Sequence, residues 1–279
     1  PWSLQSKKIK HDLAKKTIFY DNVVLKIYDF PVFFAPKFSH PDPTVDRRSG
    51  LLAPSFKNSS TLGAGLSLPY FWDISKEKDL TFTPNLYLNE NPLLLAEYKQ
   101  DFKNSFLTID AGYTQGYKKT NMTKSSGGRT HFFSNFNMSL INEKVKKSNI
   151  EINLQKVSND TYFKVYDVDT ILVKKNQSVL ENTIDLTYQN KDFYFGITPG
   201  VFEDTGKKGN LRHEYLLPLT IEKNIMVSEK YGFGDLNSDI KIRNYETNKQ
   251  ENFLVNNFNW KSNKWLNKFG FENYFEGTV

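Results

Sequence analysis

Apolar and polar residues alternate along most of the chain after residue 50. In residues 149–155, isoleucine, isoleucine and leucine occupy every second position between polar residues. An alternation with period two places apolar side chains on one face of a β-strand and polar ones on the other. About a dozen segments show this pattern, and glycine-containing loops such as residues 125–128 and 205–209 join them. A helical turn is expected only at residues 160–166, so the pattern predicts an all-β protein.

The same alternation predicts which side chains share a face. The expected apolar face includes Ile150, Ile152, Leu154, Ile240 and Ile242, and the expected polar face includes Glu151, Asn153, Lys241 and Arg243. Alternation alone does not separate a membrane barrel from a soluble sandwich, because each keeps one face away from water. The length of the segments and the placement of the aromatic residues favour a barrel, in which the apolar side chains point outward.

Shorter apolar runs fill residues 2–38. The predicted strands here are residues 4–9, 17–20 and 23–27, and the predicted turns are His11-Asp12 and Asp21-Asn22. Asp and Asn between β-branched runs are typical of hairpin turns. The spacing is tight and regular, as in a jellyroll or a stacked β-solenoid. Three or four short strands are too few for a whole domain, so this part is predicted to be the end of one.

Residues 30–84 organise the rest of the chain. Five prolines lie between Pro31 and Pro54. Proline excludes a helix and cannot supply a central strand with its full set of donors. We therefore predict an extended, stiff connector that ends on Arg47-Arg48 and a Ser-Gly turn. It divides the chain into residues 1–48, the end of one β domain with the junction, and residues 49–279, the start of another.

Composition supports the second domain as a barrel without proving it. Aromatic residues make up 15% of the chain, while the mean hydropathy is only −0.56. That pairing suits strands that are apolar on one side and carry aromatic residues near a membrane interface. Composition alone would nevertheless favour an ordinary soluble all-β protein. No apolar run approaches the roughly 18 residues of a membrane-spanning helix.

The net charge of +6 is best explained by the abundance of lysine that an A+T-rich genome produces, although a basic surface would favour an anionic partner such as phosphorylated lipid A. No Lys/Arg-rich stripe with interleaved aromatic residues occurs, so we expect no nucleic-acid partner. The chain has no cysteine and therefore no disulfide or thiolate metal site of its own. It begins at Pro1 without a signal peptide, and we expect that both native ends lie outside this sequence.

Motifs for catalysis are not found. The four histidines, His11, His40, His131 and His213, lack metal-binding spacing and are expected at the surface or the junction. No nucleophile elbow, phosphate-binding loop or dinucleotide fingerprint occurs. Asp42 and Asp46 lie in the proline-rich segment, where we expect solvated loop carboxylates. The sequence thus predicts no catalytic residue, no metal and no cofactor, and a protein that is not an enzyme.

Three linked pieces occur close together in this region: residues 31–54 (PVFFAPKFSHPDPTVDRRSGLLAP), 68–75 (LPYFWDIS) and 79–84 (DLTFTP). Together they resemble the LptD family of lipopolysaccharide-assembly proteins of the Gram-negative outer membrane. Three such pieces within about fifty residues are more specific than one short motif. Weaker similarity extends to residues 1–4, 159–163 and 216–219. The resemblance implies the end of a periplasmic β-jellyroll followed by the N-terminal part of a large antiparallel outer-membrane β-barrel.

The resemblance also implies a function and a site. Lipopolysaccharide would reach the cell surface through a lateral gate between the first and last barrel strands. Pro69 and Pro84, expected inside the first and second strands, would loosen this gate, because proline removes a ladder donor. The alternative is that each proline merely ends a strand.

The junction residues implied are Pro31, Pro36, Arg47, Arg48, Ser49 and Gly50. Two interpretations of the arginines stay open. They could pair with nearby carboxylates or interfacial phosphates, or they could stand where lipid passes from the periplasmic domain into the barrel.

Partners follow from the same resemblance. They are lipopolysaccharide, an LptE-like lipoprotein that plugs the barrel, and an LptA-like bridge protein at the jellyroll. The family's disulfides would need cysteines outside this sequence. Two other classes stay open: a porin-like channel, disfavoured by the β unit in residues 2–38, and a soluble glycan-binding β-sandwich.

Overall fold

The computed structural model describes residues 2–45, 47–116, 127–140, 147–246 and 248–279. Strands hold 68% of the residues and helices 3%, so the predicted all-β fold class is confirmed. The chain forms two compact units, Pro1–Ala96 and Glu97–Val279, and each is described by itself below. The boundary predicted between residues 48 and 49 separates the end of one β domain from the start of a barrel. The two compact units do not test it, and it stays a prediction.

Unit 1 begins with a three-stranded antiparallel sheet in the order β1-β2-β3. These strands are β1 (Trp2–Asp12), β2 (Thr17–Ile27) and β3 (Phe30–Pro41). The prediction of a connector that starts at residue 30 is therefore wrong for residues 30–41, which form the strand β3. β3 stands at an edge of this sheet, where a strand tolerates proline because its outer side has no ladder to complete.

The turn predicted at Asp21-Asn22 is also wrong, because β2 runs through both residues. The register places Pro36 opposite Asn22, between the pairs Asp21–Lys37 and Val23–Ala35. Pro36 has no N–H to donate, and Asn22 takes the left-handed conformation with φ of 53°. Asparagine tolerates that conformation better than most residues, so the strand continues past an irregular position instead of turning.

The remainder of unit 1 contains shorter strands, some of which are two parts of one interrupted strand. They are β4 (Gly50–Leu51), β5 (Ser55–Ser59), β6 (Gly63–Ser67), β7 (Tyr70–Ser75) and β8 (Lys78–Tyr87), while β9 (Leu93–Asp101) contains the unit boundary. β6 and β7 both pair with β8, and the pairs Ser67–Asn85 and Tyr70–Phe82 belong to one register. β6 and β7 are thus two halves of one strand, interrupted at residues 68–69.

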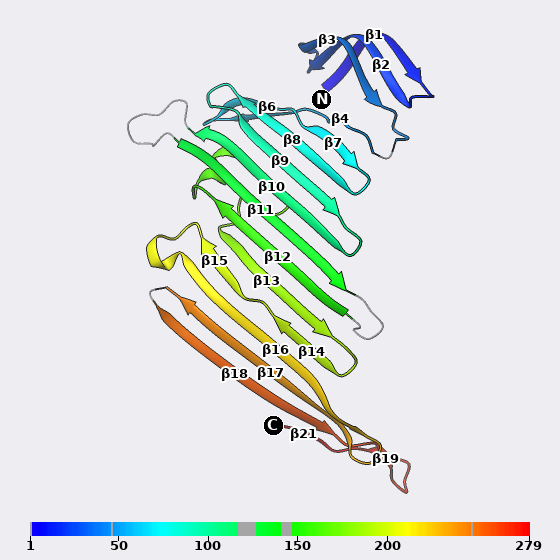
Figure 1. The fold of residues 1–279 in the computed structure, drawn as a ribbon, viewed down its shortest axis with the longest axis vertical. Helices are drawn as coiled ribbons and strands as arrows, with labels where there is room; N and C mark the ends of the chain where they lie inside the picture. The colour runs from blue at the N-terminus through cyan, green and yellow to red at the C-terminus, as the bar shows by residue number, and fades with distance from the viewer. Residues whose placement is uncertain (1, 46, 117–126, 141–146, 247) are drawn as a thin grey trace. The chain divides into compact units, whose positions relative to one another are not determined.

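Unit 2 is a large antiparallel sheet whose strands follow one another in chain order (Figure 1). Its strands are β10 (Ser105–Gly116), β11 (Gly127–Leu140), β12 (Lys147–Val157), β13 (Val179–Gln189), β14 (Phe193–Ile197), β15 (Gly200–Asp204), β16 (His213–Ser228), β17 (Gly232–Tyr245), β18 (Lys249–Lys261) and β21 (Glu276–Thr278). β14 and β15 both lie between β13 and β16. A small ladder joins β19 (Trp265–Leu266) to β20 (Glu272–Asn273).

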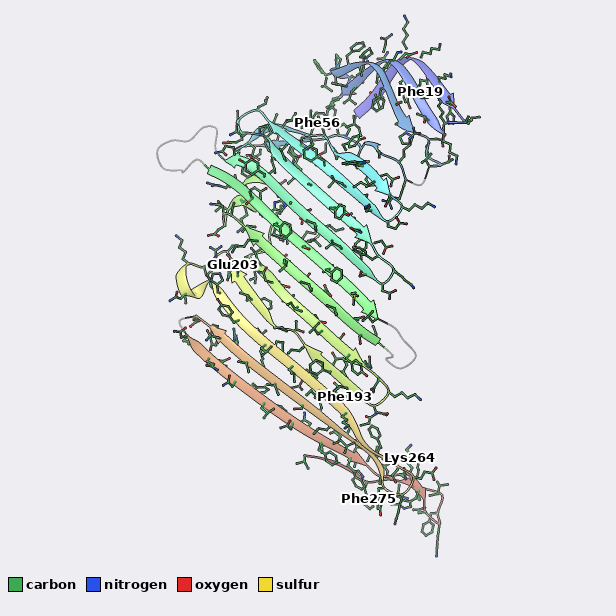
Figure 2. All side chains as sticks on the ribbon, viewed as in Figure 1. Phe19, Phe56, Phe193, Glu203, Lys264 and Phe275 are labelled. Carbon is green, nitrogen blue, oxygen red and sulfur yellow. The ribbon has the colours of Figure 1, made fainter. Side chains whose placement is uncertain are left out.

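The registers place apolar side chains on one face of this sheet. One row of paired residues runs from Leu107 through Phe136 and Ile152 to Ile184, and a second runs from Leu186 through Ile197, Leu219 and Ile240 to Leu254. Ile184 is 43% exposed and Leu254 is 62% exposed. Within the described residues this apolar face is therefore largely exposed. Figure 2 shows the side chains that project from the strands of the sheet.

The opposite face is polar and hydrogen-bonded across strands. Asn135 Nδ2 donates to Glu151 Oε1 at 2.9 Å and to Asn153 Oδ1 at 2.7 Å. Further along, Arg243 Nε donates to Glu214 Oε1 at 2.6 Å. The predicted division of apolar and polar residues in residues 149–155 is confirmed.

A segment between β12 and β13 covers part of the polar face. Its helix α1 (Tyr162–Tyr166) confirms the helical turn predicted at residues 160–166, and the short 3-10 helix η1 (Gly209–Leu211) lies between β15 and β16. Tyr162 and Phe163 are buried together with Phe133 of β11, which has no exposed surface. No helix in the described ranges combines the length and apolar content needed to cross a bilayer.

His131 lies in this small core rather than at the surface or the junction, where it was expected. Its Nε2 lies 2.6 Å from Asp110 Oδ1, and its Nδ1 lies 3.2 Å from the Tyr162 hydroxyl. The ring stacks on Phe133 with centroids 4.9 Å apart. A buried polar ring must have partners for its nitrogens, and Asp110 and Tyr162 supply them.

Replacing Phe133 by alanine tests this core. We expect a cavity that costs about 3–5 kcal/mol and releases the covering segment. Hydrogen exchange at the amides of Val165 and Val168, which bond within that segment, should accelerate by at least about 100-fold. Phe132→Ala is the matched control, since Phe132 lies on the opposite face and is 45% exposed. Equal acceleration in both variants would contradict this assignment of the core.

Candidate functional site: the junction and the interrupted strands

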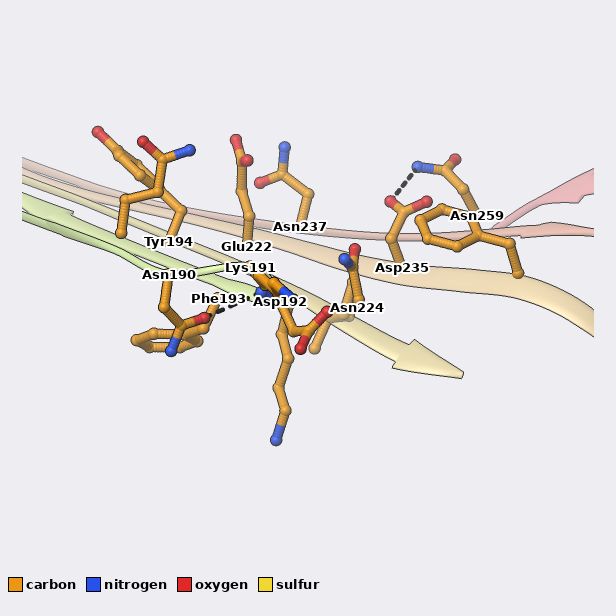
Figure 3. A pocket seen from close by; sticks show the side chains of 14 residues that line it. Asn190, Lys191, Asp192, Phe193, Tyr194, Glu222, Asn224, Asp235, Asn237 and Asn259 are labelled. Atoms are coloured by element: carbon orange, nitrogen blue, oxygen red, sulfur yellow. Dashed lines mark hydrogen bonds between the residues drawn. The ribbon is translucent and has the colours of Figure 1, made fainter. Parts of the chain in front are cut away.

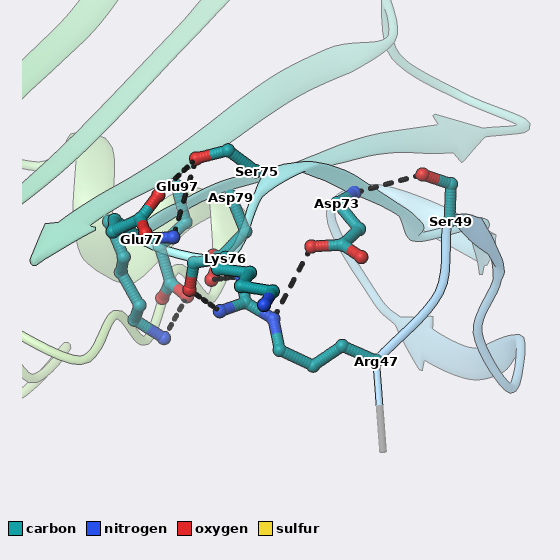
Figure 4. Close-up of polar contacts among 9 residues, drawn as sticks. Arg47, Ser49, Asp73, Ser75, Lys76, Glu77, Asp79 and Glu97 are labelled. Atoms are coloured by element: carbon teal, nitrogen blue, oxygen red, sulfur yellow. Dashed lines mark hydrogen bonds and ion pairs between the residues drawn. The ribbon is translucent and has the colours of Figure 1, made fainter. Parts of the chain in front are cut away.

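Arg47 binds the β7–β8 hairpin. Its guanidinium donates to Asp79 Oδ2 at 2.7 Å and to the Lys76 carbonyl at 2.7 Å, and its Nε lies 3.4 Å from Asp73 Oδ1 (Figure 4). Ser49 strengthens this attachment, because its hydroxyl accepts from the Asp73 amide at 2.9 Å. The planar guanidinium carries five donors, so one side chain can hold a turn carbonyl and two carboxylates together.

Arg48, the next residue, binds the three-stranded sheet instead. Its Nη1 donates to Thr17 Oγ1 at 2.5 Å and to the Lys15 carbonyl at 3.1 Å. Lys15 belongs to the turn between β1 and β2, and Thr17 begins β2. Two consecutive arginines therefore attach the chain to two different parts of unit 1.

Asp42 completes the attachment on the side of the three-stranded sheet. It is buried, with 8% of its surface exposed, and its Oδ1 accepts from the Thr44 amide at 2.8 Å. Its Oδ2 pairs with His11 Nε2 of β1. Hydrogen bonds from Thr44 hold the pKa of Asp42 below its ordinary value, and the contact with His11 lowers it further. The expectation of a solvated carboxylate is wrong for Asp42, and Asp46 lies outside the described residues.

The structure brings together only some of the predicted junction residues. Arg47, Arg48 and Ser49 act side by side, and Gly50 begins β4 by pairing with Phe71. The expected carboxylate pairing is present for Arg47, whereas Arg48 binds a hydroxyl and a carbonyl. The list of predicted junction residues also included Pro31 and Pro36, which both lie within β3.

Sequence reasoning missed several partners. The pairing of His11 with Asp42 and the contact of Arg48 with Thr17 were not predicted. The two carboxylates that Arg47 reaches, Asp73 and Asp79, were not named either, although they lie in the two motif pieces that follow the junction. The sequence did contain one signal for these contacts, namely that both motif pieces after the paired arginines contain an aspartate. Which carboxylate each arginine reaches depends on the hairpin geometry, and the spacing does not reveal it.

Pro69 and Pro84 occupy matched positions in neighbouring strands. The Leu52 amide donates to the Pro69 carbonyl at 2.8 Å, and the Leu68 amide donates to the Pro84 carbonyl at 3.1 Å. In a hydrogen-bonded antiparallel pair the two residues exchange both N–H···O bonds. Because proline has no N–H, each of these pairs keeps one bond and lacks the other.

The predicted placement of these prolines needs correction. Pro84 lies inside β8, but Pro69 lies in the interruption between β6 and β7. The strand before them, formed by β4 and β5, carries a bulge next to Pro54, since the three residues between Leu51 and Ser55 face only the two between Ser67 and Tyr70. Counted from the junction, Pro69 therefore belongs to the second strand, formed by β6 and β7, and Pro84 belongs to the third, the uninterrupted β8.

A polar pocket of about 300 Å³ lies in unit 2, around the turn between β13 and β14. Figure 3 shows Asn259 directed at Asp235, and the Asn259 amide donates to that carboxylate at 2.9 Å. Glu222 and Asn237 also line the pocket. None of the residues predicted from sequence lies here. Across the described residues no group of three or more His, Asp or Glu side chains could hold a metal ion.

These features define an all-β protein whose large antiparallel sheet is apolar on an exposed face and whose paired arginines attach a three-stranded sheet to a hairpin. No family model matches the chain. It is 27% identical over 203 residues to LPS-assembly protein LptD of Legionella pneumophila (strain Paris). The aligned region covers 70% of this chain and 24% of the Legionella protein. The predicted resemblance to LptD is confirmed.

Two further relatives carry the same name. LPS-assembly protein LptD of Nitrosococcus oceani is 27% identical over 197 residues, which is 67% of this chain and 24% of the relative. LPS-assembly protein LptD of Shewanella oneidensis is 38% identical over 98 residues, which is 35% of this chain and 13% of the relative. The matched region thus spans a quarter or less of these relatives.

Separate substitutions of Arg47 and Arg48 test whether each arginine holds a different segment of unit 1. Arg47→Ala should speed hydrogen exchange in residues 75–78, and Arg48→Ala should do so in residues 13–17. We expect a factor of about 5–30 each, since partly exposed charge-assisted bonds contribute about 1–2 kcal/mol. Each variant is the control for the other. If either substitution loosened both segments equally, the two attachments would not be independent.

Proposed function

We propose that this chain is part of an outer-membrane protein that assembles lipopolysaccharide at the cell surface, with no enzymatic step. The observation that carries the proposal is the exposed apolar face of β10–β18, which lies opposite a hydrogen-bonded polar face. A transmembrane barrel needs that division, with apolar side chains toward lipid and polar ones toward the lumen. The similarity to LPS-assembly proteins supports lipopolysaccharide as the lipid.

In this proposal residues 1–48 are the end of a periplasmic jellyroll with the junction, and residues 49–279 are the first strands of the barrel. The exposed apolar side chains of β3 support a larger lipid-handling domain. Phe30 is 77% exposed, Phe33 is 62% exposed and Phe34 is 57% exposed. An edge strand this apolar is normally covered by further protein or by a ligand.

Arg47 and Arg48 act in this proposal as the clamp between the two domains. Their donors already bind protein groups, which supports positioning of the lipid route over direct binding of lipid phosphates. Pro31 and Pro36 contribute by keeping β3 an edge strand. Lipid leaving the jellyroll would then enter the barrel beside the β7–β8 hairpin that Arg47 holds.

Pro69 and Pro84 are the proposed gate residues. A closed barrel has no free edge, so lateral opening needs a place where strand pairing is weak. Each proline removes one bond from a pair near the start of the barrel, and the bulge next to Pro54 adds a third irregularity. The gate itself would lie between the first and last strands of the complete barrel.

The partners proposed are an LptE-like lipoprotein within the barrel and an LptA-like bridge protein at the jellyroll. A large barrel lumen is usually filled or plugged. The polar face of β11 and β12 offers amide and carboxylate groups, such as Asn135 and Glu151, for contact with a plug.

The direct test is complementation. The full-length gene product is expressed in a Gram-negative host depleted of its own LPS-assembly protein, and lipopolysaccharide at the cell surface is quantified. We expect delivery to be restored. Normal insertion into the outer membrane without restored delivery of lipopolysaccharide would contradict the proposed function and would favour a porin-like channel.

Replacing both Pro69 and Pro84 by alanine tests the gate. Restoring two ladder bonds, each worth about 0.5–1.5 kcal/mol, should make opening rarer by a factor of about 5–150. The variant should insert normally yet deliver less lipopolysaccharide, and cells should become sensitive to large hydrophobic antibiotics. Pro92→Ala is the matched control, because Pro92 lies outside the strands. Normal delivery by the double variant would reduce both prolines to irregularities without a role in gating.

Photocrosslinkers on β12 test the plug. A crosslinker at Glu151 or Asn153, on the polar face, should capture a lipoprotein that co-purifies with the full-length protein. The same group at Ile152, between them in sequence and on the apolar face, should capture lipid instead. Capture of the lipoprotein at Ile152 and not at its neighbours would reverse the assignment of the faces.

A further inference from the structure

A second pair of prolines, in unit 2, repeats the arrangement of Pro69 and Pro84. The Ile184 amide donates to the Pro199 carbonyl at 3.0 Å, and the Thr198 amide donates to the Pro218 carbonyl at 3.1 Å. As in unit 1, the residue just before one proline donates to the proline of the next strand. Each pair again keeps one bond and lacks its reciprocal.

The interruption of the strands is the same as well. β14 and β15 are separated at residues 198–199, yet the pairs Ile197–Leu219 and Gly200–Leu216 belong to one register. On the other side, Leu186–Ile197 and Thr183–Gly200 also share a register. The ladder is therefore weakened at two successive pairs across β13, β14/β15 and β16, without slipping.

A glycine beside this line allows two neighbouring strands to approach closely. An ideal Cβ at Gly200 of β15 would lie 2.9 Å from Thr183 Cγ2 of β13. At Gly196 the crowding comes from within the same strand, because an ideal Cβ there would lie 2.8 Å from the Tyr194 hydroxyl. Gly65 stands in the corresponding region of unit 1, where a Cβ would lie 2.9 Å from Tyr87 Cδ1. Glycine within a strand weakens it and marks a bend or a close approach.

We infer that Pro199 and Pro218 are further positioning residues of lipid transfer, which form a second weakened line where the sheet deforms when the barrel opens. This inference rests on the proposed function. Opening a closed barrel at one strand pair changes the curvature of the remaining sheet, and that deformation concentrates where ladder bonds are missing. Missing bonds at Pro199 and Pro218 lower the energy needed to bend the sheet at β13–β16, which lie far along the chain from Pro69 and Pro84.

The experiment uses the full-length protein with Pro199 and Pro218 both replaced by alanine. Hydrogen exchange gives the first readout, because each substitution creates a new amide at residue 199 or 218. Both new amides should be protected, and exchange at Ile184 and Thr198 should slow by about 2- to 10-fold, the factor expected for one restored bond. Surface lipopolysaccharide at matched barrel levels gives the second readout, and it should fall. Pro92→Ala should change neither.

The single variants Pro199→Ala and Pro218→Ala keep the test decisive if the double variant assembles poorly. Each should show about half of the effect on delivery. Unprotected new amides would overturn the inference, and so would full protection with unchanged delivery. Wild-type protein that fails to deliver lipopolysaccharide in the complementation host would instead count against the proposed function itself.

Discussion

The antiparallel ladder is the constraint on which this structure depends. Side chains alternate with period two, so a slip of one residue would move a whole strand's apolar residues to the other face. From β10 to β18 the registers keep Phe136, Ile152 and Ile184 aligned, and the polar residues between them stay aligned too. The irregularity between Asn224 and Met226 lies near the end of β16, beyond the row that contains Leu219 and Ile240. The division into two faces therefore survives across the sheet.

Prolines interrupt this ladder in a controlled way. A proline carbonyl still accepts from the opposite strand, as at Pro84 and Pro218, so one bond of the pair survives and fixes the register. The missing donor weakens the pair without allowing it to slip. Pro36 in β3 illustrates the other solution, because the strand opposite bends locally at Asn22. Local weakness and exact alternation are thus compatible in one sheet.

The junction depends on a different interaction, the fork of donors on arginine. Arg47 and Arg48 are adjacent in sequence but bind the β7–β8 hairpin and the β1–β2 turn respectively. A lysine in either place would offer a point charge without the planar geometry. Burial of Asp42 against His11 adds a second link on the side of the three-stranded sheet. Contacts, more than the stiffness of prolines, hold this region together.

The sequence by itself determined the all-β class, the two faces of residues 149–155 and the short helix near residue 162, because period and local propensity carry that information. It could not determine whether Asp21-Asn22 turns the chain or continues a strand, since the answer depends on Pro36 in the opposite strand. Burial of His131 depends on a covering segment that starts more than twenty residues later. The missing bond at Pro199 is likewise visible only once its partner strand is known. Pairing between distant segments decides these features, and only the tertiary structure contains it.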